Sequence, residues 1–170
     1  MKLYVITGGP GVGKTTVLEL LAKKGYGIVP EAARMIVEEG SVGAGNLLSG
    51  NGLEKFQAAV AEKQLKLEAA TSVPINFLDR SLVDGYAYCM LGKISAPEAL
   101  VKNARGRYEK VFLLEPLGLY VQDEIRYEDE RLAKQIHDEI IKAYAHFGYE
   151  PIIVPVAAPE ERVDFILGKL

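Results

Sequence analysis

A glycine-rich octapeptide near the start of the sequence constrains the fold of this chain more than any other feature. Residues 2–7 form a short β-rich run, and residues 15–24 carry apolar side chains at helical spacing. Four glycines stand between these runs, and glycine adopts the backbone conformations of a tight loop at little cost. The sequence therefore predicts a strand, a loop and a helix in direct succession. The loop comprises Gly8, Gly9, Pro10, Gly11, Val12, Gly13, Lys14 and Thr15.

This octapeptide matches the phosphate-binding P-loop pattern at every fixed position, and it lies between a strand and a helix as the pattern requires. Its glycines let successive backbone N–H groups point inward at a phosphate chain, and the helix adds the positive end of its dipole. Lys14 supplies a positive charge for the β- and γ-phosphates, and the Thr15 hydroxyl is a suitable Mg²⁺ ligand. We therefore expect the loop, with Thr16 beside it, to bind ATP and Mg²⁺. A glycine turn that only joins strand to helix would leave Lys14 and Thr15 unexplained.

A carboxylate follows another predicted strand. Residues 75–78 are largely apolar, and Asp79 stands at their end, where P-loop proteins keep a carboxylate that supports Mg²⁺ directly or through water. Thr15 and Asp79 are therefore the candidate metal-binding residues. Because aspartate is also a favoured N-cap, the alternative role of Asp79 is to cap the helix that follows.

Short apolar runs alternate with helical patterns along the rest of the chain. This alternation indicates a parallel sheet covered on both faces. We expect an α/β fold, the three-layer P-loop NTPase architecture with a five-stranded parallel sheet, formed as a single domain over residues 1–170. The predicted strands are 2–7, 26–29, 75–78, 111–114 and 152–154, and the predicted helices are 15–24, 31–39, 53–70, 81–91, 97–103, 131–147 and 159–170. Five glycines within residues 40–52 indicate a flexible loop.

The composition excludes several classes of protein. Apolar residues make up 49% and charged residues 25% of the 170 residues, a balance typical of an ordered domain. Cys89 is the only cysteine, so an intrachain disulfide cannot form, and we expect a cytoplasmic protein without a membrane span. The net charge of −3 provides no overall basic field, which makes nucleic acid an unfavoured partner.

Several stretches of the sequence resemble motifs of known kinase families. Asp79, Arg80 and Ser81 resemble the Asp/Glu-Arg-Ser signature of deoxynucleoside kinases and their relatives. Taken together, the motifs resemble P-loop nucleoside-kinase-like NTPases, and more closely a set of small predicted AAA-type ATPase domains that are similar to the ribosylnicotinamide kinase domain. The matching stretches are spread over most of the chain and comprise residues 8–15, 29–34, 77–81, 127–131 and 160–163.

This resemblance implies an acceptor site beside the P-loop. Glu31, just past the second predicted strand, is similar in position to the catalytic glutamate of deoxynucleoside kinases, which would accept or orient the proton of an acceptor hydroxyl. Arg34 shares a helix face with Glu31 and is a candidate, with Arg80, for holding the acceptor. Either Glu31 or Asp79 then positions the attacking hydroxyl. The alternative for Glu31 and Arg34 is an ordinary surface ion pair.

A charged stretch after the fourth predicted strand resembles the lid of small-molecule kinases of this fold. The lid covers about residues 118–131, and Arg126 and Arg131 are the candidates to close over the transferring phosphate. The alternative for both arginines is a solvated helix face with ion pairs at helical spacing.

These observations favour an ATP-binding, Mg²⁺-dependent small-molecule kinase that moves the γ-phosphate of ATP to a nucleoside-, nucleotide- or vitamin-like acceptor. The expected catalytic residues are Lys14, Glu31, Asp79, Arg126 and Arg131. The alternative function is an ATPase or nucleotide-dependent switch that acts with a protein or nucleic-acid partner. The sequence leaves the identity of the acceptor and the oligomeric state open.

Overall fold

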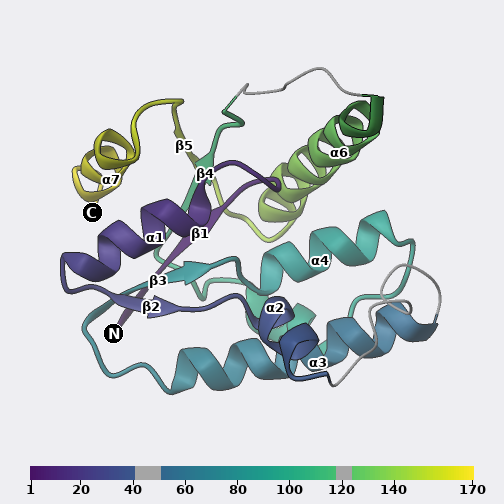
Figure 1. The fold of residues 1–170 in the computed structure, drawn as a ribbon. Helices are drawn as coiled ribbons and strands as arrows, with labels where there is room; N and C mark the ends of the chain where they lie inside the picture. The colour runs from purple at the N-terminus through teal and green to yellow at the C-terminus, as the bar shows by residue number, and fades with distance from the viewer. Residues whose placement is uncertain (41–50, 118–123) are drawn as a thin grey trace.

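The computed structural model describes residues 1–40, 51–117 and 124–170, with residues 51 and 124–130 described by their helical backbone alone. Strands and helices largely alternate along the chain (Figure 1). The strands are β1 (Lys2–Thr7), β2 (Gly27–Val29), β3 (Ile75–Asp79), β4 (Lys110–Leu114) and β5 (Ile152–Val154). The helices are α1 (Lys14–Lys23), α2 (Ala32–Glu38), α3 (Asn51–Ala69), α4 (Leu82–Leu91), α5 (Glu98–Ala104), α6 (Glu124–His146) and α7 (Pro159–Leu167). Within the described ranges, none of the helices combines the length and the apolar character that a membrane span requires.

The strands form one parallel sheet of five with the order β2-β3-β1-β4-β5. β1 lies in the middle, where Ile6 pairs with Asp79 of β3 and Thr7 pairs with Leu113 of β4. The chain builds β2 and β3 on one side of β1 and then crosses to build β4 and β5 on the other, so the connections diverge at the carboxyl end of β1. Ligands of open α/β sheets bind in the crevice that such a divergence leaves.

Successive side chains of the strands face two different layers of helices, because neighbouring residues of a strand point to opposite faces of the sheet. Tyr4 and Ile6 of β1 pack with residues of α1 and α7. Leu3 and Val5 pack on the other face with residues of α3, α4, α5 and α6. Figure 1 shows α1 and α7 on one side of the sheet and α4 and α6 on the other. The predicted three-layer α/β architecture with a five-stranded parallel sheet is confirmed.

The predicted helices and strands form within a few residues of their expected bounds, and the largest difference is at α6. A helix is predicted from residue 131, but α6 begins at Glu124. Residues 124–130 have only weak apolar periodicity, although their acidic residues favour the start of a helix. The predicted lid therefore includes the first turns of α6, and its residues 118–123 lie outside the described residues. Of the predicted glycine-rich loop, residues 41–50 also lie outside, and α3 already begins at Asn51.

A buried carboxylate holds α3 against the segment that leads into β4. The Glu68 side chain of α3 is 1% exposed and forms an ion pair with Nε of Arg107. The same carboxylate accepts hydrogen bonds from Oη of Tyr108 at 3.1 Å and from Nε2 of Gln64 at 2.9 Å. The contacts from Arg107 and Tyr108 join the C-terminal part of α3 to the segment before β4, so they fix α3 in the position from which it borders the site described below.

We expect Arg107→Met to lower the free energy of unfolding by about 2 to 4 kcal/mol, because it leaves the buried Glu68 carboxylate without its charge partner. Urea unfolding followed by circular dichroism measures the loss. The control is Lys102→Met, which breaks the Lys102–Glu98 pair, whose side chains are 69% and 78% exposed. Exposed pairs contribute little, so this control should change the free energy by less than about 0.5 kcal/mol. Equal effects of the two substitutions would contradict the anchoring role of Glu68.

Candidate functional site

The P-loop joins the carboxyl end of β1 to the N-terminus of α1, as the sequence predicts. Gly8 has a φ of +138°, and a Cβ at this position would lie 2.8 Å from the carbonyl oxygen of Leu114 in β4. Gly13, the N-cap of α1, has a φ of +90°. Glycine tolerates both conformations, and it alone fits beside Leu114. These two glycines therefore fix the course of the loop.

Lys14 extends back into the loop that precedes it. Its side chain is buried, and Nζ donates hydrogen bonds to the carbonyl oxygens of Gly8 at 3.1 Å and Gly9 at 2.9 Å. Burial, followed by the nearby Arg80 guanidinium, lowers the pKa of Lys14 to about 8. The loop thus concentrates one positive charge where its backbone curls.

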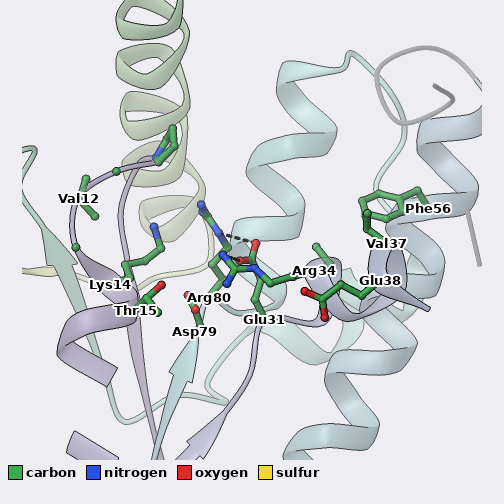
Figure 2. Close-up of a pocket in the computed structure, with 14 residues that line it drawn as sticks. Val12, Lys14, Thr15, Glu31, Arg34, Val37, Glu38, Phe56, Asp79 and Arg80 are labelled. Carbon is green, nitrogen blue, oxygen red and sulfur yellow. Dashed lines mark hydrogen bonds and ion pairs between the residues drawn. The ribbon is translucent and has the colours of Figure 1, made fainter. Parts of the chain in front are cut away.

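A cavity of about 880 Å³ opens beside the loop at the carboxyl edge of the sheet (Figure 2). The P-loop bounds it on one side and α2 on the other, and Figure 2 shows Val37 and Phe56 at the end away from Lys14. The charged side chains that line the cavity balance each other. They are the cations Lys14, Arg34 and Arg80 and the carboxylates Glu31, Glu38 and Asp79.

Thr15 and Asp79 line this cavity together. Asp79 ends β3 and is 8% exposed, and its Oδ1 is buried without a hydrogen-bond partner among the described residues. Burial, followed by the negative charge of Glu31, raises the pKa of Asp79 above its ordinary value. A partnerless carboxylate oxygen and a hydroxyl at one cavity fit a hard cation such as Mg²⁺, which prefers oxygen ligands.

The predicted acceptor-site residues Glu31, Arg34 and Arg80 also come together. Nε of Arg80 donates to Oε1 of Glu31 at 3.1 Å, and Nη1 of Arg80 donates to the carbonyl oxygen of Gly8 at 3.4 Å. Nη2 of Arg34 lies 3.7 Å from Oε2 of Glu31, and the Arg34 side chain is 58% exposed. The expected ion pair with Arg34 is therefore present. The closer partner of Glu31 is the largely buried Arg80, which connects it to the P-loop (Figure 2).

The alternative role of Asp79 as an N-cap is wrong, because Ser81 caps α4. Oγ of Ser81 accepts a hydrogen bond from the N–H of Val83 at 3.1 Å. The Asp84 side chain completes a capping box, since its Oδ2 accepts a hydrogen bond from the N–H of Ser81 at 2.9 Å. With the helix capped two residues later, the Asp79 carboxylate is left to face the cavity.

Asp84 is a buried carboxylate whose role the sequence reasoning missed. It is 1% exposed, and it accepts hydrogen bonds from the Thr7 hydroxyl of β1 and from Oη of Tyr144 in α6, the latter at 2.6 Å. Its Oδ1 lies 3.7 Å from Nη1 of Arg80. A serine followed three residues later by an acidic residue is the local signal of a capping box. The contacts with Thr7 and Tyr144 have no local signal, because they join residues far apart in the sequence.

Arg162 of α7 is a second residue whose role was missed. It is 2% exposed, and its guanidinium donates to the carbonyl oxygens of Val12 at 2.6 Å, Pro155 at 3.0 Å and Glu115 at 3.1 Å. Burial lowers the pKa of Arg162 below its usual value. In the sequence, the one sign of this role is that Arg162 stands directly before Val163, one of the apolar residues that α7 buries. Arg162 thus ties the P-loop to the segments that follow β4 and β5.

The remaining predicted site residues lie outside these contacts. Thr16 is in the first turn of α1 and is exposed. Arg131 is exposed on α6 and is not among the described residues that line the larger cavity. Arg126 lies in the first turn of α6, in the part for which only the backbone is described. The lid role of Arg126 and Arg131 stays a prediction.

A smaller cavity of about 250 Å³ adjoins the larger one and is lined mainly by residues of α2, α3 and α4. The two cavities share Glu31, Ala33, Phe56 and Arg80. The carboxylate and guanidinium of the Glu31–Arg80 pair therefore stand at the junction of the two spaces.

Comparison with protein families matches residues 3–162 to the family described as AAA domain. The chain belongs to this family. The resemblance to small AAA-type ATPase domains, which the motifs predicted, is confirmed. No match was found among curated protein sequences.

This AAA domain shares its fold with solved structures of two other proteins. The NadR protein in complex with NAD and AMP-PNP aligns with a TM-score of 0.70 and 18% identity over 98% of this chain and 49% of that chain. The NadR protein in complex with NR aligns with a TM-score of 0.65 and 20% identity over 90% of this chain and 43% of that chain. The YorR protein from Bacillus subtilis in complex with phosphorylated GDP aligns with a TM-score of 0.59 and 16% identity over 99% of this chain and 95% of that chain. The chain thus spans less than half the length of the two NadR chains.

We expect Asp84→Asn to lower the free energy of unfolding by about 2 to 4 kcal/mol, because an amide N–H₂ would face groups that donate to the buried carboxylate. Tyr144→Phe removes one of these donors and should cost about 1 to 2 kcal/mol. Denaturant titration of both variants measures the difference. A smaller loss for Asp84→Asn than for Tyr144→Phe would show that Asp84 is not the centre of these contacts.

Proposed function

We propose that this chain is an ATP- and Mg²⁺-dependent kinase that transfers the γ-phosphate of ATP to a hydroxyl of a nucleoside-, nucleotide- or vitamin-like small molecule. The observation that carries the proposal is the junction of two cavities at Glu31 and Arg80. One cavity lies beside the P-loop lysine, and the other is lined mainly by residues of three helices. A phosphate donor in the larger cavity and an acceptor in the smaller one would meet at the Glu31 carboxylate. A protein that only hydrolyses ATP has no need of the second space.

The P-loop side of the larger cavity suits the triphosphate. Lys14 already holds its ammonium inside the loop on two carbonyl oxygens, and phosphate oxygens are stronger partners because they carry full charge. Phosphoryl transfer depends mainly on positioning and on stabilising charge on the transferring group. In this proposal, Lys14 stabilises the negative charge of the β- and γ-phosphate oxygens.

Glu31 is proposed to act on the acceptor. Arg80 fixes Oε1 of Glu31. Among the described residues, the ion-pair partner of the other oxygen, Oε2, is the exposed Arg34 at 3.7 Å. An incoming hydroxyl can take the place of this weak contact. Glu31 would then accept the hydroxyl proton or orient the oxygen for in-line attack on the γ-phosphate.

Thr15 and Asp79 are proposed to hold Mg²⁺. The partnerless Oδ1 of Asp79 supports this assignment, since it could serve as a ligand of the cation, and a bound cation would favour the ionised carboxylate. When bound there, the ion would neutralise part of the negative charge of the phosphate groups.

Incubation with ATP, Mg²⁺ and a panel of nucleosides, nucleotides and vitamin precursors tests the proposed activity, with products identified by mass spectrometry. We expect an acceptor of the panel to gain one phosphate. Glu31→Gln should lower this transfer by roughly 10²- to 10⁴-fold, the contribution typical of a general base. ATP turnover without any phosphorylated panel member would instead support the ATPase or switch function.

Two further variants control this experiment. Lys14→Ala should abolish nucleotide binding, and Glu62→Gln, an exposed glutamate of α3, should leave the transfer rate unchanged. If Glu31→Gln transfers phosphate as fast as the wild-type protein, Glu31 takes no part in the reaction.

The affinity for ATP should also depend on the protonation of Lys14, whose pKa is lowered to about 8 by burial and Arg80. Below pH 8 the ammonium is charged before ATP binds, so the affinity should be nearly constant. Above pH 8 binding requires uptake of a proton, and the association constant should fall by up to about tenfold per pH unit. Calorimetric titration with ATP and Mg²⁺ between pH 7 and 9.5 measures this slope.

Lys14→Arg is the matched variant for the pH dependence. Arginine keeps its charge across this range, so any residual affinity of the variant should not fall between pH 8 and 9.5. A wild-type affinity that is the same at pH 7 and 9.5 would contradict the assignment of Lys14 as the phosphate ligand.

A further inference from the structure

The guanidinium of Arg162 is buried beside the P-loop, although it stands 150 residues after the loop residue that it contacts. Its Nη1 donates a hydrogen bond to the carbonyl oxygen of Val12 at 2.6 Å. Its Nε and Nη2 donate to the carbonyl oxygens of Pro155 at 3.0 Å and Glu115 at 3.1 Å. Among the described residues, its hydrogen-bond acceptors are thus carbonyl oxygens and not carboxylates. Burying a charge without such an ion pair is costly, so this placement needs an explanation.

Two of these three carbonyl groups fix the guanidinium to the sheet. Glu115 directly follows β4, and Pro155 directly follows β5. The two strands pair with each other, and the N–H of Glu115 donates to the carbonyl oxygen of Val154 at 3.1 Å. The ends of both strands therefore hold the guanidinium in place, and its third contact reaches Val12 of the P-loop.

The contact with Val12 sets the direction of the peptide group between Val12 and Gly13. The described part of the chain contains only trans peptide bonds, in which the C=O and N–H bonds point in opposite directions. Because the Val12 carbonyl points at Arg162, the N–H of Gly13 points away from it. Gly13 lines the larger cavity with Lys14, whereas Arg162 is not among the described residues that line it.

This peptide group needs an anchor, because its neighbour allows it to turn over. A peptide reverses its direction when ψ of the residue before it and φ of the residue after it change together. The residue after it is Gly13, whose φ is +90°, and glycine adopts positive and negative φ about equally readily. A reversed peptide would turn the partial negative charge of the Val12 oxygen toward a bound phosphate and repel it.

We propose that Arg162 is a positioning residue for the nucleotide phosphates: it holds the Val12 carbonyl and thereby keeps the N–H of Gly13 directed into the larger cavity, where this N–H donates to a phosphate oxygen. The inference rests on one part of the proposed function, the binding of ATP by the P-loop. Arg162 itself does not touch the nucleotide. Because the N–H groups of a P-loop surround the α- and β-phosphates, ADP depends on this arrangement as ATP does.

Calorimetric titration of the whole chain with ATP and with ADP, each with Mg²⁺, tests this role without phosphate transfer. Arg162→Met removes the hydrogen-bond donors of the guanidinium. We expect it to weaken the binding of both nucleotides by roughly 10- to 100-fold, the effect of one hydrogen bond to a charged group. The titrations are made well below the thermal midpoint of each variant, so that the loss reflects the folded protein.

Ile166→Ala is the control for a purely structural effect. Ile166 is fully buried one turn beyond Arg162 on α7, so its truncation also destabilises the helix packing. This variant should lower the thermal midpoint and leave the affinities for ATP and ADP unchanged. If Arg162 only stabilises the fold, Arg162→Met should do the same.

The amide resonance of Gly13 in the NMR spectrum reports the direction of the peptide group itself. A hydrogen bond to a phosphate oxygen deshields the amide proton, so this proton should move downfield when ADP and Mg²⁺ are added. The same shift should occur in Ile166→Ala and should be clearly smaller in Arg162→Met. Gly25, at the other end of α1 and also with a φ of +90°, is the internal reference and should not move.

Three results would overturn the role of Arg162 alone: equal affinities of Arg162→Met and the wild-type protein, an equal loss of affinity in Ile166→Ala, or a wild-type Gly13 amide that does not respond to ADP. The last result needs no variant and holds even if Arg162→Met does not fold. A wild-type protein that binds neither nucleotide would overturn the kinase proposal as well. Arg162-dependent binding of ATP without any phosphorylated acceptor would support the role of Arg162 and contradict the kinase proposal.

Discussion

The guanidinium of Arg80 is the group on which the rest of the site depends. It donates to Oε1 of Glu31 at 3.1 Å and to the carbonyl oxygen of Gly8 at 3.4 Å, and it lies 3.7 Å from Oδ1 of Asp84. One side chain thereby connects the P-loop with the first residues of α2 and α4. The backbone of Arg80 has a φ of +68°, a left-handed conformation that costs about 1 kcal/mol for a residue other than glycine. These contacts hold the residue in that conformation.

The distribution of charge divides the site into two unlike halves. The chain carries a net charge of −3, yet its larger cavity balances three cations against three carboxylates. The smaller cavity has two carboxylates and one guanidinium that is already paired. A concentrated phosphate site is therefore compatible with an acidic protein, because the cations are gathered at the P-loop and at the pair formed by Glu31 and Arg80. The same distribution supports a charged phosphate donor in the larger cavity.

Local patterns were sufficient to predict the sheet and the phosphate loop. Apolar runs mark each strand, and glycine spacing marks the loop, so Lys14, Thr15 and Asp79 were expected at one cavity and line one. Contacts between segments that are distant in the sequence leave no local pattern from which they could be predicted. Asp84 and Arg162 each depend on partners brought near by the fold. The start of α6 was missed for another reason, since residues 124–130 form a helix without the apolar stripe that marks a packed one.

A crystal structure of the protein with Mg²⁺, a non-hydrolysable ATP analogue and a nucleoside tests most directly whether the two cavities hold donor and acceptor. We expect Nζ of Lys14 to leave the carbonyl oxygens of Gly8 and Gly9 for the β- and γ-phosphate oxygens. The nucleoside should lie in the smaller cavity with a hydroxyl group at Glu31. A triphosphate bound while Lys14 stays on the loop carbonyls, or a nucleoside bound outside the smaller cavity, would contradict this account.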